Sequence, residues 1–428
     1  MPISGSKNAA LAILAGALLV SEGETTLDNL PRIGDIRTMA EVLTHFGATA
    51  RFEADGRTVH LDASRLTSTE APADLVARMR ASFWALGPIL ARCGEARIAQ
   101  PGGCNIGARP IDLHLKGLAA LGAQIETGYG YVQARVPAEG LRGASVYLDF
   151  ASVGATMNIM MAASLAPGVT VIENAAQEPD IEDLGDFLNA LGAQISGHGS
   201  GVVTIHGVEG LRAAATQRYE VISDRMEAGT YGLAAGITGG DLFLKGASAE
   251  HLRPVTLKMI EAGMRVEEHP DGIRCIGPQN RRGTATRVTA LPHPGFPTDM
   301  QQAFTAYLAT AEGTSMVSDQ VYENRFRCLT ELGKMGVQSQ VDGRTAVITG
   351  TARLTGADVE ATDLRAGAAL VVAGLAAEGQ TRISHIEHLD RGYEALTEKL
   401  RNVGAHIWRE DESGAGPLWK TEPQWKAA

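Results

Sequence analysis

Several features that would assign this chain to a class of protein are scarce in its sequence. Only four of its 428 residues are cysteines, and their spacing matches neither a disulfide framework nor a zinc site. There is no Walker glycine–lysine motif and no dinucleotide fingerprint. The formal net charge of −11 argues against a general nucleic-acid binder, but not against an anionic small substrate held by a few local cations. The cysteine content fits a reducing, cytoplasmic setting.

Long hydrophobic runs are also absent. The first apolar run, residues 9–20, follows Lys7 and resembles a secretory signal, but no small-x-small cleavage site comes after it. It is too short for a bilayer, which requires about 20 residues. Because similar runs recur five times further along, we expect a buried helix here and no membrane association.

The chain instead carries one pattern written six times. An apolar segment rich in Ala, Leu, Ile and Met ends each time at glycine, which is typical of a buried helix with a left-handed C-terminal residue. A short β-type run, an amphipathic helix and an alternating stretch follow. The six apolar segments are residues 7–23, 79–94, 153–168, 226–239, 300–313 and 364–379.

This repeat predicts an α/β protein of two domains with three units each, because the chain is too long for one ordinary core. The period is about 70 residues, longer than in solenoid repeats. We expect a first domain at 7–220 and a second at 221–408, with 1–6 joining the second. The first unit lacks the β-type run that precedes the others. Residues 409–428 are expected to form a poorly ordered tail.

Charged residues gather at the starts of the apolar segments. Helix N-termini attract anions through their free N–H groups and positive dipole end. Asp224, Thr298 and Asp363 could be simple N-caps. That explanation does not extend to Lys7, Arg80 or Arg365, whose charges are unfavourable at a positive dipole end unless an anion offsets them. The pattern therefore favours an anionic ligand.

A glycine- and proline-rich stretch, residues 100–114, is the strongest candidate for a functional loop. It carries Cys104 close to Arg109, which could favour the thiolate or bind an anion beside it. A surface loop with an incidental cysteine is the alternative. His114 and His293 could serve in acid–base chemistry, but a lone histidine is more often structural.

Taken in order, the motifs resemble those of the UDP-N-acetylglucosamine 1-carboxyvinyltransferases, the enolpyruvyl transferases of peptidoglycan synthesis. The resemblance extends over about residues 3–408 and rests on GSKNAA at 5–10, MRAS at 79–82, the loop at 101–114, SVGAT at 152–156, PTDM at 297–300, ENRF at 323–326, TDLRA at 362–366 and DRGYE at 390–394. It implies a two-domain inside-out α/β barrel with an active site in the cleft. It also implies transfer of the enolpyruvyl group of phosphoenolpyruvate to the 3-hydroxyl of UDP-N-acetylglucosamine, with release of phosphate and without metal or organic cofactor.

The resemblance further implies roles for individual residues. Cys104 would protonate the methylene carbon of phosphoenolpyruvate, and Asp299 would accept the proton of the sugar hydroxyl. Lys7, Arg109 and Arg391 would hold the phosphate and carboxylate. A wider substrate-binding set would comprise Asn8, Arg80, Arg109, Pro110, Ile111, Asp112, Leu113, Ser152, Val153, Val321, Arg325, Asp363 and Arg365.

Two positions depart from the family pattern. Phe150 and Gln177 stand where basic residues are usual in part of the family, which could weaken or alter nucleotide binding. A paralogue acting on another nucleotide or sugar acceptor is therefore an alternative, as is a catalytically silent regulator that binds nucleotide sugar. The presence of all four residues assigned to catalysis favours an enzyme.

Overall fold

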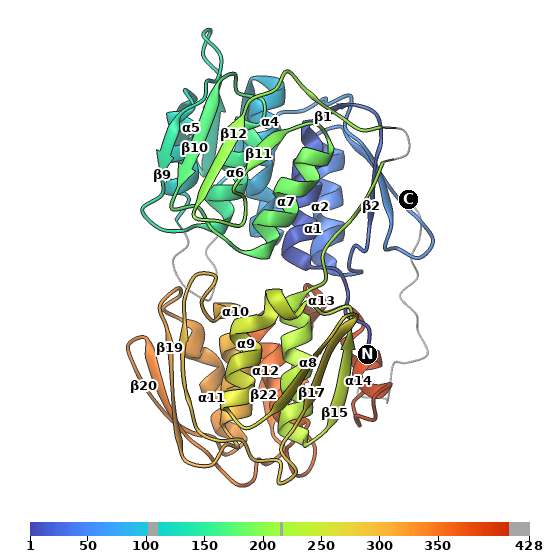
Figure 1. Cartoon of the computed structure of the whole chain (residues 1–428), viewed down its shortest axis with the longest axis vertical. Coiled ribbons are helices and arrows are strands. Elements are labelled where there is room, and N and C mark those ends of the chain that lie inside the picture. Colours follow the sequence, from blue (N-terminus) through green and yellow to red (C-terminus); the bar gives the residue numbers. More distant parts are fainter. Residues whose placement is uncertain (102–109, 215–216, 411–428) are drawn as a thin grey trace. The chain divides into compact units, whose positions relative to one another are not determined.

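The structure, a computed structural model, describes residues 1–101, 110–214 and 217–410 (Figure 1). These residues form two compact units, one made of residues 5–222 and the other of residues 223–410 together with Met1–Ser4. Each unit has a hydrophobic core of its own, because the buried apolar side chains form two clusters that divide at the same place. They are called here the 5–222 unit and the 223–410 unit.

Six helices are apolar nearly all round and buried, as the repeat predicts. They are α1 (Lys7–Gly16), α4 (Leu86–Cys93), α6 (Val153–Ala163), α8 (Arg225–Thr238), α10 (Thr298–Leu308) and α12 (Leu364–Gly374). Asp224 and Asp363 cap α8 and α12 by accepting hydrogen bonds from backbone amides, so both are N-caps. Gly94 and Gly239 adopt the left-handed conformation after α4 and α8, as expected of a closing glycine.

The segment predicted at 79–94 is not one continuous helix. It begins as the 3₁₀ helix η2 (Arg80–Ala85) and becomes α-helical only at Leu86. Pro88 explains the change, because a proline has no N–H and its ring excludes the carbonyl of the residue four positions earlier. An α-helix can therefore accommodate Pro88 in its first turn but cannot run through it from Arg80.

Each of the six sequence repeats also contains a second helix, which is amphipathic. These helices are α2 (Gly34–His45), α5 (Asp112–Ala120), α7 (Pro179–Ala190), α9 (Ala249–Glu261), α11 (Cys328–Lys334) and α14 (Leu396–Arg401). All six are closed by the same hydrogen bond, in which the residue after a glycine donates its N–H to the carbonyl five residues back. The pairs are Ala48 to Leu43, Ala123 to Leu118, Ala193 to Leu188, Met264 to Met259, Val337 to Leu332 and Ala405 to Leu400. The remaining helices are η1 (Ala17–Leu19), α3 (Ala73–Arg78), η3 (Arg325–Arg327) and α13 (Glu387–Asp390).

Four sheets share one strand order, which we describe as edge, inner, middle and outer. The inner strand follows the buried helix, runs parallel to the edge strand and runs antiparallel to the middle strand. The four are β14 (Arg218–Glu220)–β2 (Thr25–Asp28)–β4 (Val59–Asp62)–β3 (Thr49–Phe52), β5 (Glu70–Ala71)–β6 (Glu95–Ala99)–β8 (Tyr131–Arg135)–β7 (Gln124–Gly128), β9 (Ser145–Tyr147)–β10 (Val169–Glu173)–β12 (Val202–His206)–β11 (Gln194–Ser196) and β18 (Arg287–Ala290)–β19 (Thr314–Asp319)–β21 (Thr345–Thr349)–β20 (Gln338–Asp342). The protein is thus a mixed α/β protein of repeated units, which confirms the predicted class.

The other sheets are shorter. The fifth contains the inner strand β15 (Asp241–Lys245), the middle strand β17 (Gly272–Ile276) and the outer strand β16 (Arg265–His269), and the sixth pairs the edge strand β22 (Asp358–Glu360) with the inner strand β23 (Arg382–Ser384). A further parallel pair joins β1 (Val20–Glu22) to β13 (Leu211–Arg212).

The edge strand of the first unit comes from an unexpected part of the chain. The sequence predicts that the first repeat lacks an edge strand, but β14 pairs with β2 in parallel and supplies one. By its place in the chain, β14 would instead be expected to belong to the fourth repeat. Pro2 forms a parallel bridge to Lys245 of β15 instead, supported by the bond from Ile3 N to Lys245 O of 3.0 Å. The last strand of the 5–222 unit therefore completes its first sheet, which adjacency in sequence does not indicate.

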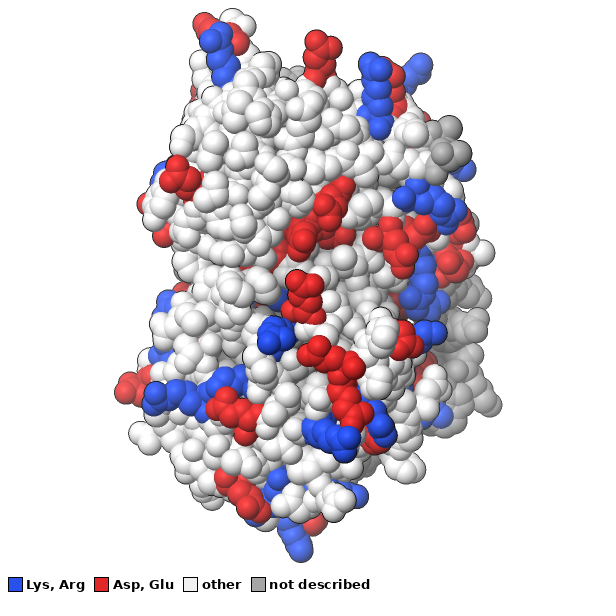
Figure 2. All heavy atoms as spheres, in the orientation of Figure 1, with Lys and Arg blue, Asp and Glu red and all other residues white. Residues whose placement is uncertain are grey.

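In the 223–410 unit the sheets containing β15 and β19 flank the helices α8, α9, α11 and α12 (Figure 1). On the face drawn in Figure 2, acidic and basic side chains are interspersed. None of the helices in the described parts of the chain has the length and hydropathy needed to cross a bilayer.

One buried carboxyl of the 5–222 unit makes stability depend on pH. Asp183 in α7 accepts hydrogen bonds from Tyr219 Oη (2.7 Å) and Ile222 N (3.3 Å), and burial raises its pKa to about 7. The folded state binds the Asp183 proton more tightly than the unfolded state. Protonation of Asp183 therefore adds fully to the free energy of unfolding below about pH 4, and this stabilisation is lost as the pH rises through about 7.

We therefore expect Asp183→Asn to flatten the dependence of the melting temperature on pH between about pH 5 and pH 8. Thermal unfolding followed by circular dichroism at several pH values measures this slope. Glu182→Gln is the matched control, because Glu182 lies in the same helix with its side chain exposed. Equal slopes in the wild type and Asp183→Asn would refute the assignment.

Candidate functional site

Three predicted residues of the 223–410 unit meet in one cluster. The Asp299 carboxylate accepts a hydrogen bond from Arg325 Nη2 at one oxygen. At the other oxygen it accepts bonds from Arg365 Nε (3.3 Å) and Nη2 (3.2 Å). The two arginine side chains are 3% and 4% exposed, whereas that of Asp299 is 26% exposed. A carboxylate accessible to solvent is thus backed by two buried, permanent cations, and the cluster carries a net positive charge.

The first turn of α10 positions Asp299. Thr298 is not the N-cap, a position that Pro297 occupies. It is the first residue of this helix and donates its hydroxyl to Asp319 Oδ2 at 2.7 Å. The other oxygen of Asp319 accepts the backbone N–H groups of Val321 (2.9 Å) and Tyr322 (2.8 Å). One buried carboxylate therefore fixes both the start of α10 and the turn that contains the predicted residue Val321.

Arg365 is held from its far side by a tyrosine. Its Nη1 donates to Tyr393 Oη at 3.1 Å, and Tyr393 Oη also contacts Thr230 Oγ1 of α8 at 2.9 Å. Both Arg365 and Tyr393 are buried. The Arg365 guanidinium is therefore held between Tyr393 and Asp299, and these two contacts restrict its side chain to one conformation.

Arg391 and Asp363 lie at the start of α12. Gly392 packs so closely on Leu364 that a Cβ atom added there would lie 2.6 Å from Leu364 Cδ2, which brings the backbone of Arg391 against this helix. Asp363 accepts the N–H groups of Arg365 (2.9 Å) and Ala366 (3.1 Å) through one oxygen. Asp363 thus orients the first turn, from which Arg365 projects.

In the 5–222 unit, Lys7 and Asn8 are the first residues of α1. Lys7 Nζ lies 3.0 Å from Asp35 Oδ2, and the lysine side chain is 15% exposed. Ser6, just before the helix, donates its hydroxyl to Asp180 Oδ1 at 2.8 Å. Asp35 thus offsets a lysine charge that is unfavourable at this helix end.

The other described residues predicted for this unit also stand at helix starts. Arg80 begins η2, Ser152 caps α6 with its hydroxyl, and Val153 is the first residue of α6. The helix η2 packs against both α1 and α6. Pro110 and Ile111 lead into α5, which begins with Asp112 and Leu113. The predicted residues Cys104 and Arg109 lie outside the described residues.

The two histidines have different surroundings. His114 Nδ1 contacts the Asn158 amide nitrogen at 3.0 Å, and Asn158 accepts the N–H of Gly87 at 2.6 Å, so the pair joins α5, α6 and α4. For His293, burial lowers the pKa to about 4, with a further contribution from Arg225. His293 is therefore neutral near pH 7.

Sequence reasoning missed several residues that position the predicted ones. They are Thr230, Tyr393, Asp319 and Gln302, whose amide donates to Arg325 O at 2.9 Å, and Asp35 of α2. Tyr393 lies inside the DRGYE motif and could have been singled out there. Asp319 lies only two residues before Val321, whereas Thr230, Gln302 and Asp35 are distant in sequence from their partners and no local pattern marks them.

Comparisons with known proteins agree with the motifs. The family model of EPSP synthase (3-phosphoshikimate 1-carboxyvinyltransferase) matches residues 1–400. UDP-N-acetylglucosamine 1-carboxyvinyltransferase 1 of Halalkalibacterium halodurans is 50% identical over 407 residues, covering 95% of this chain and 91% of the relative. UDP-N-acetylglucosamine 1-carboxyvinyltransferase 2 of Carboxydothermus hydrogenoformans is 53% identical over 407 residues and covers 95% of each chain.

Solved structures agree in fold. The enolpyruvyl transferase NikO from Streptomyces tendae superposes with a TM-score of 0.84 at 27% identity, covering 95% of this chain and 94% of its own. EPSP synthase from Acinetobacter baumannii superposes with a TM-score of 0.71 at 19% identity over 95% of both chains. At that identity the second likeness concerns the fold alone.

The tyrosine behind Arg365 can be tested by removing one oxygen atom. We expect Tyr393→Phe to lower the turnover number of enolpyruvyl transfer by roughly tenfold, because Arg365 loses the partner that aims it at Asp299. Steady-state kinetics and the melting temperature are measured together. Tyr307→Phe is the control, because Tyr307 is buried in the same unit but donates to Ala262 O at 2.9 Å. If both variants lose stability equally and neither loses turnover, the positioning role is wrong.

Proposed function

The chain belongs to the EPSP synthase family of enolpyruvyl transferases, and within it to the UDP-N-acetylglucosamine 1-carboxyvinyltransferases; from this premise we propose how its residues carry out the reaction. It is a transferase that moves the enolpyruvyl group of phosphoenolpyruvate to UDP-N-acetylglucosamine, the first committed step of peptidoglycan synthesis. The similarity to relatives of this activity along nearly the whole chain carries this conclusion.

The reaction requires one proton to leave the acceptor and one to reach the donor. The 3-hydroxyl oxygen of the sugar bonds to C2 of phosphoenolpyruvate while a proton is added to C3, which gives a tetrahedral intermediate. Loss of that C3 proton and of phosphate then restores the double bond. A base near the sugar hydroxyl and an acid near C3 are therefore needed.

Asp299 is the proposed base. Its carboxylate is the accessible member of the Asp299 cluster, while Arg325 and Arg365 lie buried behind it. Two guanidiniums make a carboxylate a weak base, so we propose that the phosphate and carboxylate of phosphoenolpyruvate compete for these cations when they bind. Asp299 then gains basicity only when the donor substrate is present.

Cys104 is the proposed acid, and it would act as a thiol because only the protonated form can give a proton to C3. Lys7, Arg109 and Arg391 would bind the anionic groups of phosphoenolpyruvate and stabilise charge on the leaving phosphate. Because Lys7 Nζ lies 3.0 Å from Asp35 Oδ2, a bound phosphate would compete with Asp35 for this lysine.

The nucleotide-sugar side would be formed by a second group. It comprises Asn8, Arg80, Arg109, Pro110, Ile111, Asp112, Leu113, Ser152, Val153, Asp299 and Val321, and Asp363 belongs to the wider substrate-binding set. Several of these are first residues of helices, where free N–H groups suit the diphosphate of a uridine nucleotide.

We further propose that the two units are the enolpyruvyl transferase domains predicted at 7–220 and 221–408. Each would be an inside-out α/β barrel, with three buried helices inside and sheets and amphipathic helices around them. The protein would act in the cytoplasm, as expected for this family. The six copies of one helix and sheet pattern support this arrangement.

A different acceptor is a second candidate, favoured by one observation. Phe150, which replaces a basic residue of part of the family, is 45% exposed and offers no charge to a diphosphate. Incubation with phosphoenolpyruvate and UDP-N-acetylglucosamine, with phosphate release and product mass as readouts, decides between the two. Other uridine nucleotides serve as parallel acceptors.

Thiol acid catalysis is tested at Cys104. We expect Cys104→Ser to lower turnover by at least about 100-fold, because a serine hydroxyl is a far weaker acid, while Cys104→Asp retains more activity because a carboxylic acid can donate a proton. The melting temperature of each variant controls for folding. Near-normal turnover of Cys104→Ser would exclude the thiol as the acid.

The missing charge is tested by restoring it. We expect Phe150→Lys to lower KM for UDP-N-acetylglucosamine by roughly threefold or more without a change in kcat, and salt should weaken the effect. Val202→Lys places the same charge at another exposed apolar position of this unit and should change neither constant. An equal response of both variants would show a general effect of net charge.

A further inference from the structure

One buried carboxylate next to the Asp299 cluster is not accounted for by the repeated fold. Asp319 is the last residue of the inner strand β19 and is 0% exposed. In the other repeats the last residue of the inner strand is either apolar or at least partly exposed. These residues are Asp28, Ala99, Glu173, Lys245 and Ser384. Because burial of a carboxylate is costly unless hydrogen bonds compensate it, the contacts of Asp319 indicate why an acid stands here.

Three hydrogen bonds compensate the burial of Asp319. Its Oδ2 accepts the Thr298 hydroxyl at 2.7 Å, and its Oδ1 accepts the N–H groups of Val321 and Tyr322 at 2.9 and 2.8 Å. The sheet in turn holds the backbone of Asp319, whose N–H donates to Arg344 O at 2.9 Å. The carboxylate is therefore a fixed point to which both the start of α10 and the turn after β19 are bonded.

The start of α10 depends on this outside support. The helices α1, α6, α8 and α12 are each capped by the side chain of their own N-cap residue, whereas the N-cap of α10 is Pro297, which makes no such bond. Thr298 instead donates its hydroxyl away from the helix, to Asp319. A carboxylate at this end of a helix is also favoured by the helix dipole. Asp319 therefore holds the first turn of α10, which carries Asp299.

The turn after β19 leads to the same cluster from another direction. The Arg325 guanidinium lies over the Tyr322 ring, with Cζ 5.1 Å from the ring centroid, and a cation is attracted to an aromatic face. Arg325 in turn donates to Asp299. Asp319 thus reaches Asp299 by two routes. One runs through Thr298, the neighbour of Asp299 in α10, and the other runs through Tyr322 and Arg325.

We propose that Asp319 and Thr298 are positioning residues for the transfer reaction, and that they set the distance between the base and the acceptor sugar. The inference rests on the proposed roles of Asp299 as the base and of Val321 on the nucleotide-sugar side. The start of α10 and the Val321 N–H are bonded to the two oxygens of one carboxylate. The acceptor that contacts Val321 and the base that takes its proton therefore share one point of reference. Such control matters because a misplacement of about 1 Å can lower a rate on the order of 100-fold.

Removal of the Thr298 hydroxyl tests the proposal. We expect Thr298→Val to lower kcat roughly tenfold, because α10 loses its outside support, and to change KM for UDP-N-acetylglucosamine by less than about twofold, because Asp319 still holds Val321. Thr298→Ser keeps the hydroxyl and should retain a kcat within about twofold of the wild type. Asp319→Asn should also lower kcat. The double variant Thr298→Val/Asp319→Asn should lose about as much as the more affected single variant, since both changes act on one hydrogen bond.

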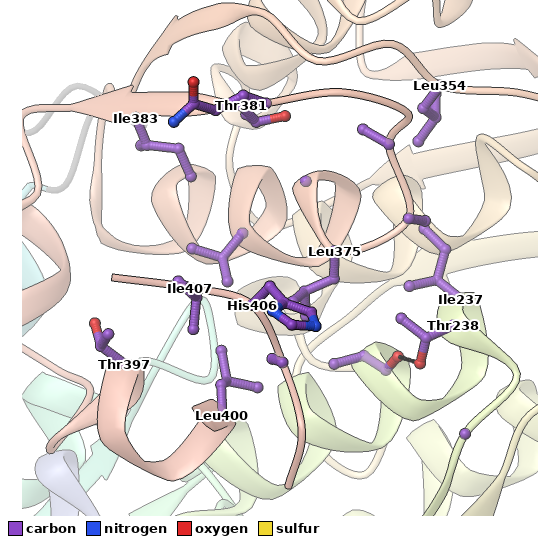
Figure 3. A pocket seen from close by; sticks show the side chains of 18 of the residues that line it. Ile237, Thr238, Leu354, Leu375, Thr381, Ile383, Thr397, Leu400, His406 and Ile407 are labelled. Carbon is purple, nitrogen blue, oxygen red and sulfur yellow. Dashed lines mark hydrogen bonds between the residues drawn. The ribbon is translucent and has the colours of Figure 1, made fainter. Parts of the chain in front are cut away.

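The same substitution at the other end of α10 is the matched control. Thr310 lies just after that end, and its hydroxyl donates to Tyr307 O at 3.1 Å. Together with Leu375 it lines a groove of about 1520 Å³ (Figure 3), which no residue of the Asp299 cluster lines. Thr310→Val should therefore lower the melting temperature about as much as Thr298→Val but should leave kcat unchanged. If Thr298→Val does not fold, Thr298→Ala is measured in its place.

Several results would overturn the proposal. A normal kcat for Thr298→Val shows that the bond does not position the base, and an equal loss of kcat in Thr310→Val shows a general effect of stability. A loss that Thr298→Ser shares, or losses that multiply in the double variant, also contradict it. Asp299→Asn separates this inference from the proposed function. Near-normal turnover of Asp299→Asn refutes the base itself, whereas an inactive Asp299→Asn beside a normal Thr298→Val refutes only the positioning.

Discussion

Six helices that are apolar on nearly every side impose the main constraint on this protein. A helix with a single apolar face can lie on a surface, but one that is apolar all round must be covered from every direction. In each unit, amphipathic helices and small sheets pack against the three buried helices. The repeated sheets, the repeated closing hydrogen bond and the two separate cores all follow from that need.

The same constraint explains the placement of function. Helices buried along their length expose only their ends, and the predicted polar residues of both units stand at such ends: Lys7 on α1, Ser152 just before α6, Asp299 on α10 and Arg365 on α12. Because the rest of each helix is buried, the backbone that carries these side chains is held in place. The fixed N–H groups and cations suit substrates whose bound groups are phosphates and a carboxylate.

Much of this could be predicted from the sequence, since the buried helices leave a strong periodic signal and the family motifs lie in order along the chain. The details that failed depend on contacts remote in sequence. The pairing of β14 with β2 joins residues about 190 positions apart, and Pro88 breaks a segment that reads as one helix. The motifs likewise predict Asp299, Arg325 and Arg365 as site residues, but they do not predict the contact of Thr230 with Tyr393.

The pairing of β14 with β2 has a topological consequence. Ser6 N donates to Ile222 O at 2.6 Å and Asp224 N donates to Ser4 O at 2.8 Å, so the chain enters and leaves the 5–222 unit at neighbouring positions. Such a unit is in effect an insertion within the other, with adjacent ends that a short linker could join. Its first sheet is formed without any residue of the other unit, so the 5–222 unit could be exchanged as a whole between related chains.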